Sequence, residues 1–423
     1  MPTGTGMDQL FVAPSFTAAA LMAAAVDEGL YADAGTTVLL TVGTAPIPEL
    51  GGDLATQPGF DGPARRFDRV VSLNEAIYPQ HPSSWDPDTD DGRRQAVAAA
   101  VGLREPFGIT LPSVSAAPSD ALLRVFPEGP VDVVVDAAAG YGPPRPALPS
   151  QVMARLRRLV SLDLAGGLRP ALVREHALEH AVVPPAAFRA VVPDDAGRAV
   201  GQESADAIVL GQDLSPLSPD EEQRLHEAFL RVAAALGHRR VVLAPPPSGP
   251  SASAHRLPAL AEELGLRLRV LDDPVPAEVL YAALRPAAAI GCCSTGLVTA
   301  SEVYGMDAYA VGIDEVLERF GPDDRLGAAL VGTRLPRVDV APDGTLVRQA
   351  PLDVDLPLLA EETARTDVTA SRDRSAQAPA ASPVPARTRL RRDVARAVRA
   401  ASRRSRVVRR ATAVAQAVVF HPR

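Results

Sequence analysis

The sequence predicts an α/β protein of two doubly wound, Rossmann-like domains facing each other across a cleft, followed by a disordered linker and a basic C-terminal helix. A chain of 423 residues is too long for one ordinary core. Short apolar strands alternate with helices in two separate series, and the composition changes abruptly after residue 362. We place the domains at 1–195 and 196–362, the linker at 363–386 and the tail at 387–423.

The first series opens with a βαβ unit. Gln9–Ala13 is a buried strand, Ser15 is a suitable N-cap for a helix over Phe16–Glu28, and Thr37–Val42 is the next strand. Further elements continue the alternation: a helix over Gln95–Val101 and strands at Phe107–Leu111 and Val131–Asp136. After this strand we expect a pause in the strands until residue 207.

The second series is more regular and contains five expected strands and four expected helices. The strands are Ala207–Leu210, Arg240–Leu243, Arg267–Leu271, Ala287–Ile290 and Ala308–Val311. The helices are Pro219–Leu236, Leu257–Leu264, Pro276–Leu284 and Thr295–Val303. With a hinge within Val191–Gly201, two such domains give the layout of GT-B glycosyltransferases, which other two-domain α/β proteins share.

Charge is distributed unevenly between the body and the tail. Residues 387–423 hold twelve arginines against the single acid Asp393, a net charge of +11, so residues 1–386 carry −19 of the total of −8. The apolar positions of Thr388–Ala417 recur at helical spacing, which predicts a basic amphipathic helix that an anionic membrane surface attracts. A solvated appendage or a contact with the acidic body is the alternative. The acidic body disfavours a specific nucleic-acid partner.

The remaining composition predicts a cytoplasmic protein, with the tail placing it on the inner face of the cell membrane. Cys292 and Cys293 are adjacent and cannot form an ordinary structural disulfide. The N-terminus lacks a basic region followed by an apolar stretch, and no apolar run approaches the ~18 residues of a membrane span.

Two strand-end loops carry candidate chemistry, because ligands of open α/β sheets bind at the carboxyl ends of strands. Asp136 ends one strand and is either a general base or the cap of the next turn. The small-residue loop Gly291–Gly296 leads into a helix, which suits an anion, although Ser294 and Thr295 also serve as plain N-caps. A third loop, Ala244–Ser248, is stiffened by prolines and offers no proton.

Several stretches in one order resemble the bacterial α-2,8-polysialyltransferase family, over about residues 8–315. They are LFVAPSFTAAALMAAAVDEGLY, LNEAIYPQHPSSWDP, YGPPRPALP with RLVSLDL and GLRPALV, LGQDLSPLSPDEEQRLHEAFL, PVPAEVLYAALRP and GCCSTGLVTASEVYG. The resemblance implies a GT-B sialyltransferase that binds a CMP-activated sialic acid between its domains. It transfers the sugar to a glycan acceptor with inversion, without a cofactor or a metal.

Carried over by position, the resemblance implies that Asp136 is the general base, although Ala137 stands where the family has glycine. It also implies that Ser294 and Thr295 bind the donor phosphate. The further predicted substrate-binding residues are Gly296, Pro246, Ser248, Gly140, Tyr141 and Arg145. The family's His-Pro motif falls on Pro246-Pro247, so a ring without a proton replaces the histidine. Only His255 is placed to substitute as the acid, because His238 precedes its strand. The His81-Pro82 pair belongs to a different family segment and is either an acceptor-side feature or a turn.

Two functional hypotheses follow. The first is an active sialyltransferase-like enzyme in surface glycan assembly; the second, motivated by Pro246, is a non-catalytic relative that binds or regulates in such a pathway. A rival metallopeptidase hypothesis rests on His176, Glu179 and His180, which satisfy an inverted zinc motif if they lie on a helix. Chance is the better explanation of so short a motif. No Walker loop or dinucleotide-binding glycine motif supports a kinase or a dehydrogenase.

Overall fold

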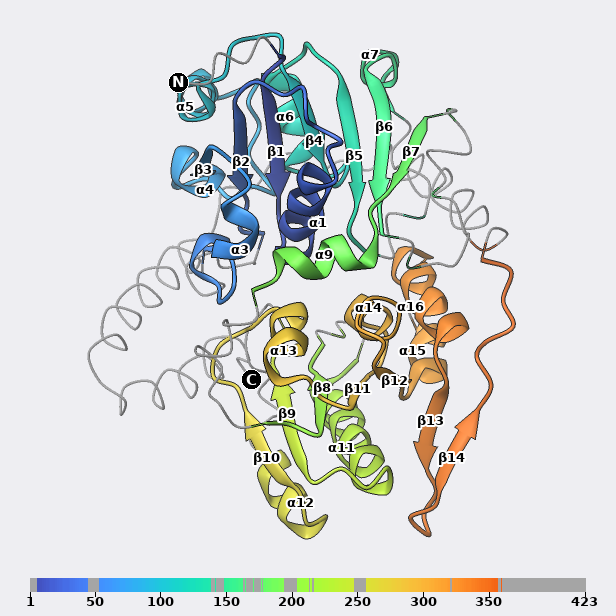
Figure 1. The fold of residues 1–423 in the computed structure, drawn as a ribbon. Helices are drawn as coiled ribbons and strands as arrows, with labels where there is room; N and C mark the ends of the chain where they lie inside the picture. The colour runs from blue at the N-terminus through green and yellow to red at the C-terminus, as the bar shows by residue number, and fades with distance from the viewer. Residues whose placement is uncertain are drawn as a thin grey trace, which may run out of the picture.

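The structure, a computed structural model, contains two seven-stranded sheets, drawn one above the other in Figure 1. It describes residues 6–44, 53–137, 141, 148–162, 164, 170, 176, 178–193, 204–212, 214, 217–246, 256–319, 322–356 and 359. The predicted linker and tail, and most of the predicted hinge, lie outside these residues. No helix in the described part of the chain is long and apolar enough to cross a membrane.

The first sheet is parallel throughout and has the order β3-β2-β1-β4-β5-β6-β7. Its strands are β1 (Gln9–Ala13), β2 (Thr37–Thr41), β3 (Arg69–Ser72), β4 (Gly108–Leu111), β5 (Val131–Val135), β6 (Leu156–Ser161) and β7 (Glu179–Val182). The expected pause after residue 136 is therefore wrong, since β6 and β7 extend the sheet. Both strands mix charged with apolar residues at half-buried positions, which hides them from a search for apolar runs.

The second sheet has the order β10-β9-β8-β11-β12-β13-β14, and only its β13–β14 pair is antiparallel. Its strands are β8 (Ala207–Leu210), β9 (Arg240–Ala244), β10 (Arg267–Val270), β11 (Ala288–Gly291), β12 (Asp307–Ala310), β13 (Arg337–Val340) and β14 (Leu346–Gln349). The five predicted strands are confirmed to within one residue at each end. The hairpin β13–β14 at the edge was not predicted. Two doubly wound domains, the predicted fold class, are present.

The helices follow the strands in chain order. They are α1 (Phe16–Asp27), α3 (Asp61–Ala64), α4 (Leu73–Ala76), α5 (Asp91–Val101), α6 (Ser119–Val125), α7 (Ser150–Met153), α9 (Pro185–Val191), α11 (Pro219–Ala235), α12 (Leu257–Glu263), α13 (Ala277–Leu284), α14 (Thr295–Glu302), α15 (Ile313–Arg319) and α16 (Pro322–Arg334), with a 3₁₀ turn at Leu54–Thr56. Helix α5 starts four residues before the predicted Gln95, because Asp90 caps it by accepting a hydrogen bond from Arg93 N.

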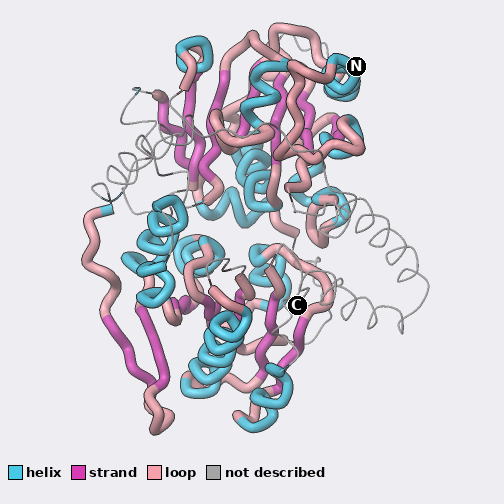
Figure 2. Tube along the Cα trace, turned by 180° about the vertical axis from the view of Figure 1, so that it is seen from behind, coloured by secondary structure: helices cyan, strands magenta, loops and turns pink. Residues whose placement is uncertain are grey.

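Helix α1 is buried on nearly every side, as its alanine-rich sequence requires. Residues 18–25 are all fully buried, and a helix that is apolar all round is stable only when it is enclosed. It lies on the first sheet, packs against α9, and joins a single apolar cluster that continues into α13 and α14 of the second domain. Figure 1 shows α9, α13 and α14 between the two sheets and α1 in front of the first sheet, and Figure 2 shows helices at the same level from behind. The N-terminus of α1 is thereby fixed at the boundary between the domains.

The end of the described chain returns to the first domain. Ala329 and Leu330 of α16, together with Leu356, belong to the same buried cluster as the first-domain residues Leu10 and Tyr141. Two apolar contact regions therefore connect the domains, one through α1 and α9 and the other through α16. The candidate site lies at the first of these regions, since Thr17 of α1 contacts Glu278 of α13.

Candidate active site

Asp136 directly follows β5 and is held by the N-terminus of α1. The Ser15 hydroxyl donates to Asp136 Oδ2 at 2.9 Å and accepts from Ala18 N at 3.0 Å, so one side chain caps the helix and orients the acid. Burial raises the pKa of Asp136, and the hydrogen bond from Ser15 opposes that rise. A desolvated carboxylate binds a proton more readily than an exposed one.

A second acid, Glu278, reaches the boundary from α13 and was not predicted. Its carboxyl is buried and its Oε1 accepts from the Thr17 hydroxyl of α1 at 2.7 Å, across 261 residues of sequence. Burial raises the pKa of Glu278, and the nearby charge of Asp136 adds to that rise. Two acids, one from each domain, therefore share a poorly hydrated region.

Two tyrosines connect Glu278 to the predicted anion loop, Gly291–Gly296. Tyr281 is fully buried, and its hydroxyl donates to Gly296 O at 3.0 Å, while the Tyr304 hydroxyl donates to Glu278 O at 3.2 Å. The two rings meet edge to face at 5.3 Å between centroids. Hydrogen bonds and packing thus join the acids near β5 to the N-terminus of α14.

The predicted anion loop has the geometry of a helix N-terminus after a parallel strand. Ser294 is the N-cap of α14, and its Oγ accepts from Gly296 N at 3.2 Å. A serine hydroxyl can accept and donate at once, so capping leaves Ser294 able to donate to a phosphate oxygen. Gln212, which follows β8, fixes the start of the loop because its Oε1 accepts from Cys292 N and Cys293 N, both at 2.9 Å. A side chain at Gly296 would meet Leu210 Cδ1 at 3.1 Å.

Pro246, where the family has its histidine, is buried just beyond β9. It packs closely on the end of β8, since a Cβ on Gly211 would lie 3.1 Å from Pro246 Cδ and 2.8 Å from Ala244 O. The position therefore lies at the carboxyl edge of the second sheet, as the motif requires, but it carries no titratable group.

The other predicted site residues have mixed placements. Tyr141 is buried, and its hydroxyl donates to Leu162 O at 3.0 Å within the first domain. Thr295 begins α14 beside Ser294. Four of them lie outside the described residues: Gly140, Arg145, Ser248 and His255.

The zinc-motif helix is wrong for two of the three residues. Glu179 and His180 lie on β7, where His180 Nε2 is 2.9 Å from Ser161 Oγ and adjacent side chains point to opposite faces. Within the described ranges, no group of three or more His, Cys, Asp or Glu side chains is arranged to hold a metal ion.

Fold and site geometry together define the fold class. Two doubly wound domains, with an acid at the carboxyl edge of one sheet and a helix N-terminus at that of the other, have the GT-B layout. Residues 140–311 match the model of the family described as alpha-2,8-polysialyltransferase (POLYST). The resemblance is confirmed over that segment, and the protein is sialyltransferase-like.

Solved structures with distant similarity share most of the chain's length. The GT-B domain of a sialyltransferase from Photobacterium damselae is 9% identical, covering 77% of this chain and 97% of that one with a TM-score of 0.42. A UDP-glucosyltransferase from Polygonum tinctorium is 13% identical, covering 87% and 95% with a TM-score of 0.45. An E. coli heptosyltransferase is 11% identical, covering 72% and 88% with a TM-score of 0.35. No curated protein sequence matches the chain.

Proposed function

We propose that this protein transfers sialic acid, or a related acidic sugar, from a CMP-activated donor to a glycan acceptor with inversion at the anomeric carbon. The observation that carries the proposal is the buried chain of contacts that joins Asp136, through Ser15 and helix α1, to Glu278 and the N-terminus of α14. It supports the proposal because an acid and the N-terminus of a helix lie on either side of one interdomain boundary.

In the proposed reaction, Asp136 accepts the proton of the acceptor hydroxyl as that oxygen bonds to the anomeric carbon. The bond from that carbon to the phosphate oxygen breaks, and CMP leaves with the electron pair. Ser294 and the first amides of α14 stabilise the departing phosphate by hydrogen bonds and by the helix dipole. Arg145 and Ser248 stay predicted substrate-binding residues, and His255 stays the predicted substitute for the missing acid.

The test is sugar transfer by the wild type and Asp136→Asn, with Asp91→Asn on the exposed start of α5 as the matched control. We expect Asp136→Asn to lower transfer about 10²–10⁴-fold, the usual contribution of a general base, while CMP binding in a calorimetric titration stays intact. Asp91→Asn leaves both unchanged. Full transfer by Asp136→Asn, or binding of UMP or ADP as tightly as CMP, contradicts the proposal.

Pro246 favours one second candidate, a non-catalytic relative that retains the fold and regulates glycan assembly. The specific observation is that the buried side chain of Pro246, just beyond β9, has no proton to donate. Selective CMP binding without transfer or donor hydrolysis for any donor tested supports this candidate and rules out the first.

We further propose that residues 387–423 attach the protein to an anionic membrane surface, since the net charge of this segment is +11. Deletion of the segment is expected to abolish co-sedimentation with phosphatidylglycerol vesicles but not with neutral ones. Unchanged sedimentation contradicts this role.

A further inference from the structure

The predicted anion loop begins with two adjacent cysteines. Cys292 and Cys293 follow β11 and directly precede Ser294, the N-cap of α14. Neither is disulfide-bonded; Cys292 is buried and Cys293 is half-buried. Because this chain contains no other cysteine, an intramolecular disulfide can only join these two residues. The proposed transfer reaction uses neither thiol.

The two thiol groups are hydrogen-bonded to each other. This hydrogen bond, together with burial, raises the pKa of the Cys292 thiol. Cys293 is the more exposed sulfur, so a reagent in solution reaches it first. An accessible thiol beside a buried one is the arrangement of an attacking thiol with its resolving partner.

One side chain from the neighbouring strand holds both cysteines. Gln212 follows β8, which pairs with β11. Its Oε1 accepts from Cys292 N and Cys293 N, both at 2.9 Å, and its Nε2 donates to Cys293 Sγ at 3.5 Å. The peptide bond between the two cysteines contains one of these N–H groups. The position of this peptide therefore depends on contacts with both the backbone and the sulfur of Cys293.

A disulfide between the two cysteines is incompatible with this arrangement. Consecutive Cα atoms lie about 3.8 Å apart, whereas the Cα atoms of disulfide-bonded residues usually lie about 4.4–6.8 Å apart. The ring closed by adjacent cysteines is therefore strained, and the peptide inside it must rotate to relieve that strain. Rotation moves Cys293 N away from Gln212. Strained disulfides are also reduced easily, which is typical of regulatory rather than structural disulfides.

The movement is expected to reach the N-terminus of α14, because Ser294 is the next residue. Ser294 Oγ accepts from Gly296 N at 3.2 Å, and Ser294 O accepts from Leu297 N at 3.0 Å. Both contacts require the backbone before Ser294 to keep its present course. A helix presents its first amides to an anion only while its first turn is ordered. Oxidation of the cysteines should therefore weaken anion binding at this loop.

We infer that Cys292 and Cys293 form a reversible dithiol–disulfide switch that reacts with low-molecular-weight disulfides and disorders the predicted anion loop when oxidised. The Cys293 thiolate first attacks one sulfur of the reagent, which forms a mixed disulfide and releases one thiol. The Cys292 thiol then loses its proton and attacks the Cys293 sulfur, which releases the second thiol. The cysteine pair loses two electrons and two protons, and the disulfide of the reagent gains them.

The first test is oxidation of the full chain with bis(2-hydroxyethyl) disulfide, followed by mass spectrometry and non-reducing electrophoresis. We expect the monomer to lose two hydrogen atoms and dithiothreitol to restore them. Cys292→Ala should retain the mixed disulfide on Cys293, because no second thiol displaces it, and Cys292→Ala/Cys293→Ser should not react. A wild type that stays reduced, keeps the mixed disulfide or forms only a disulfide-linked dimer overturns the inference.

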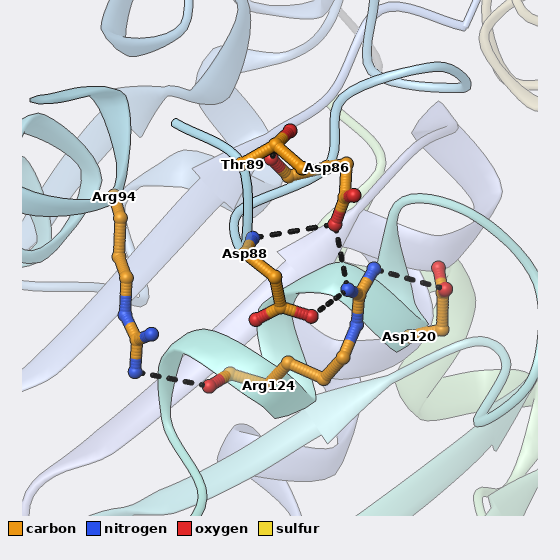
Figure 3. Close-up of polar contacts among 6 residues, drawn as sticks. All are labelled: Asp86, Asp88, Thr89, Arg94, Asp120 and Arg124. Atoms are coloured by element: carbon orange, nitrogen blue, oxygen red, sulfur yellow. Dashed lines mark hydrogen bonds and ion pairs between the residues drawn. The ribbon is translucent and has the colours of Figure 1, made fainter. Parts of the chain in front are cut away.

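Hydrogen exchange measures the effect on the loop without any ligand. Oxidation should speed exchange of the Cys292 and Cys293 amides by about tenfold or more, because their hydrogen bonds to Gln212 are lost. The internal reference is Asp88 N, which donates to Asp86 Oδ1 at 3.2 Å in the first domain. Figure 3 shows this amide in the cluster of acids around Arg124. Like the cysteine amides it is held by a side-chain oxygen, and its exchange should not change. Unchanged exchange at the cysteines, or equal changes at both places, contradicts the inference.

Calorimetric titration with CMP relates the switch to the proposed function, on which this last part rests. Oxidised wild type should bind CMP about tenfold more weakly than reduced wild type, the effect of losing roughly one hydrogen bond to a charged group. Cys292→Ala/Cys293→Ser should bind CMP equally with and without the oxidant. No CMP binding by the reduced protein refutes the proposed function, and the mass and exchange measurements then decide on the switch. Equal CMP affinity of reduced and fully oxidised wild type refutes control of the anion loop.

Discussion

Replacing Ser15 with alanine tests how the structure prepares Asp136. The hydroxyl has two partners: it accepts from Ala18 N as the N-cap of α1 and donates to Asp136 Oδ2. Losing a serine N-cap costs about 1 kcal/mol, and losing a hydrogen bond to a charged group costs about 1.5–3 kcal/mol. We expect Ser15→Ala to lower the free energy of unfolding by about 2.5–4 kcal/mol at neutral pH.

The matched control is Ser218→Ala, which removes the N-cap of α11. Ser218 is exposed, and its partners are the backbone and the side chain of Glu221. It should cost about 1 kcal/mol, because its bond to the Glu221 carboxylate is exposed, so the difference between the two variants reports the contribution of the less exposed bond to Asp136. At roughly 2–4 °C per kcal/mol, the first-domain unfolding midpoint should fall by about 5–15 °C in Ser15→Ala.

The pH dependence has a definite sign. The Ser15 bond stabilises the charged form of Asp136, so its contribution is present above the folded-state pKa and is lost as pH falls through it. Because burial raises the pKa of Asp136, the excess cost of Ser15→Ala should be lost at a higher pH than for an exposed aspartate. The acid limb of transfer should also move to higher pH in this variant. Thermal unfolding from pH 4 to 8 measures both variants, and equal costs at every pH would refute the reasoning.

Three further predictions concern other groups of the protein. Pro246→His restores a proton donor and should raise the rate of sugar transfer by about 10²-fold or more. A variant that folds and binds CMP but transfers sugar no faster would show that this position does not contact the leaving group. Glu278→Gln keeps the hydrogen bond from Thr17 and removes a buried group that ionises, so it should stabilise the protein increasingly as pH rises above 4.5. The exposed control Glu262→Gln should not have this effect, and identical pH curves for the two variants would contradict the prediction. Burial lowers the pKa of His226 from 6.5 to about 4, so the free energy of unfolding should fall by about 3 kcal/mol between pH 6.5 and 4. His226→Leu should flatten this pH dependence, measured by urea unfolding at each pH. An unchanged pH dependence would argue against a neutral buried imidazole.

The central strands could be predicted because burial on both faces requires a continuous apolar run. Gln9–Ala13 and Ala207–Leu210 match the observed β1 and β8 at both ends. Strands nearer the edges are different. Arg157 and Arg158 interrupt β6 because one pairs with Asp132 and the other contacts Leu30 O, contacts that only the folded sheet creates. The local sequence of such a strand therefore contains too little information to predict it.

The same limit applies to the site. Asp136 and Ser294 could be found because they follow apolar strands, and the ends of parallel strands are where ligands bind. Glu278 lies inside a helix, and its partner Thr17 is on the other domain. The available signal was an acid on an apolar helix face beside Val279, Leu280 and Tyr281, which requires a buried partner but does not identify it.

The two acids also bear on the choice between an enzyme and a non-catalytic relative. Burial raises the pKa of both Asp136 and Glu278, and the charge of Asp136 adds to the rise at Glu278. A boundary that served only to hold two domains together would be more stable with apolar side chains there, as the surrounding cluster already is. Pro246 removes one proton from the opposite side of the reaction, but leaving-group departure can proceed more slowly with hydrogen bonds alone. A slow enzyme accounts for both the costly acids and the missing histidine, whereas a purely structural relative accounts only for the second.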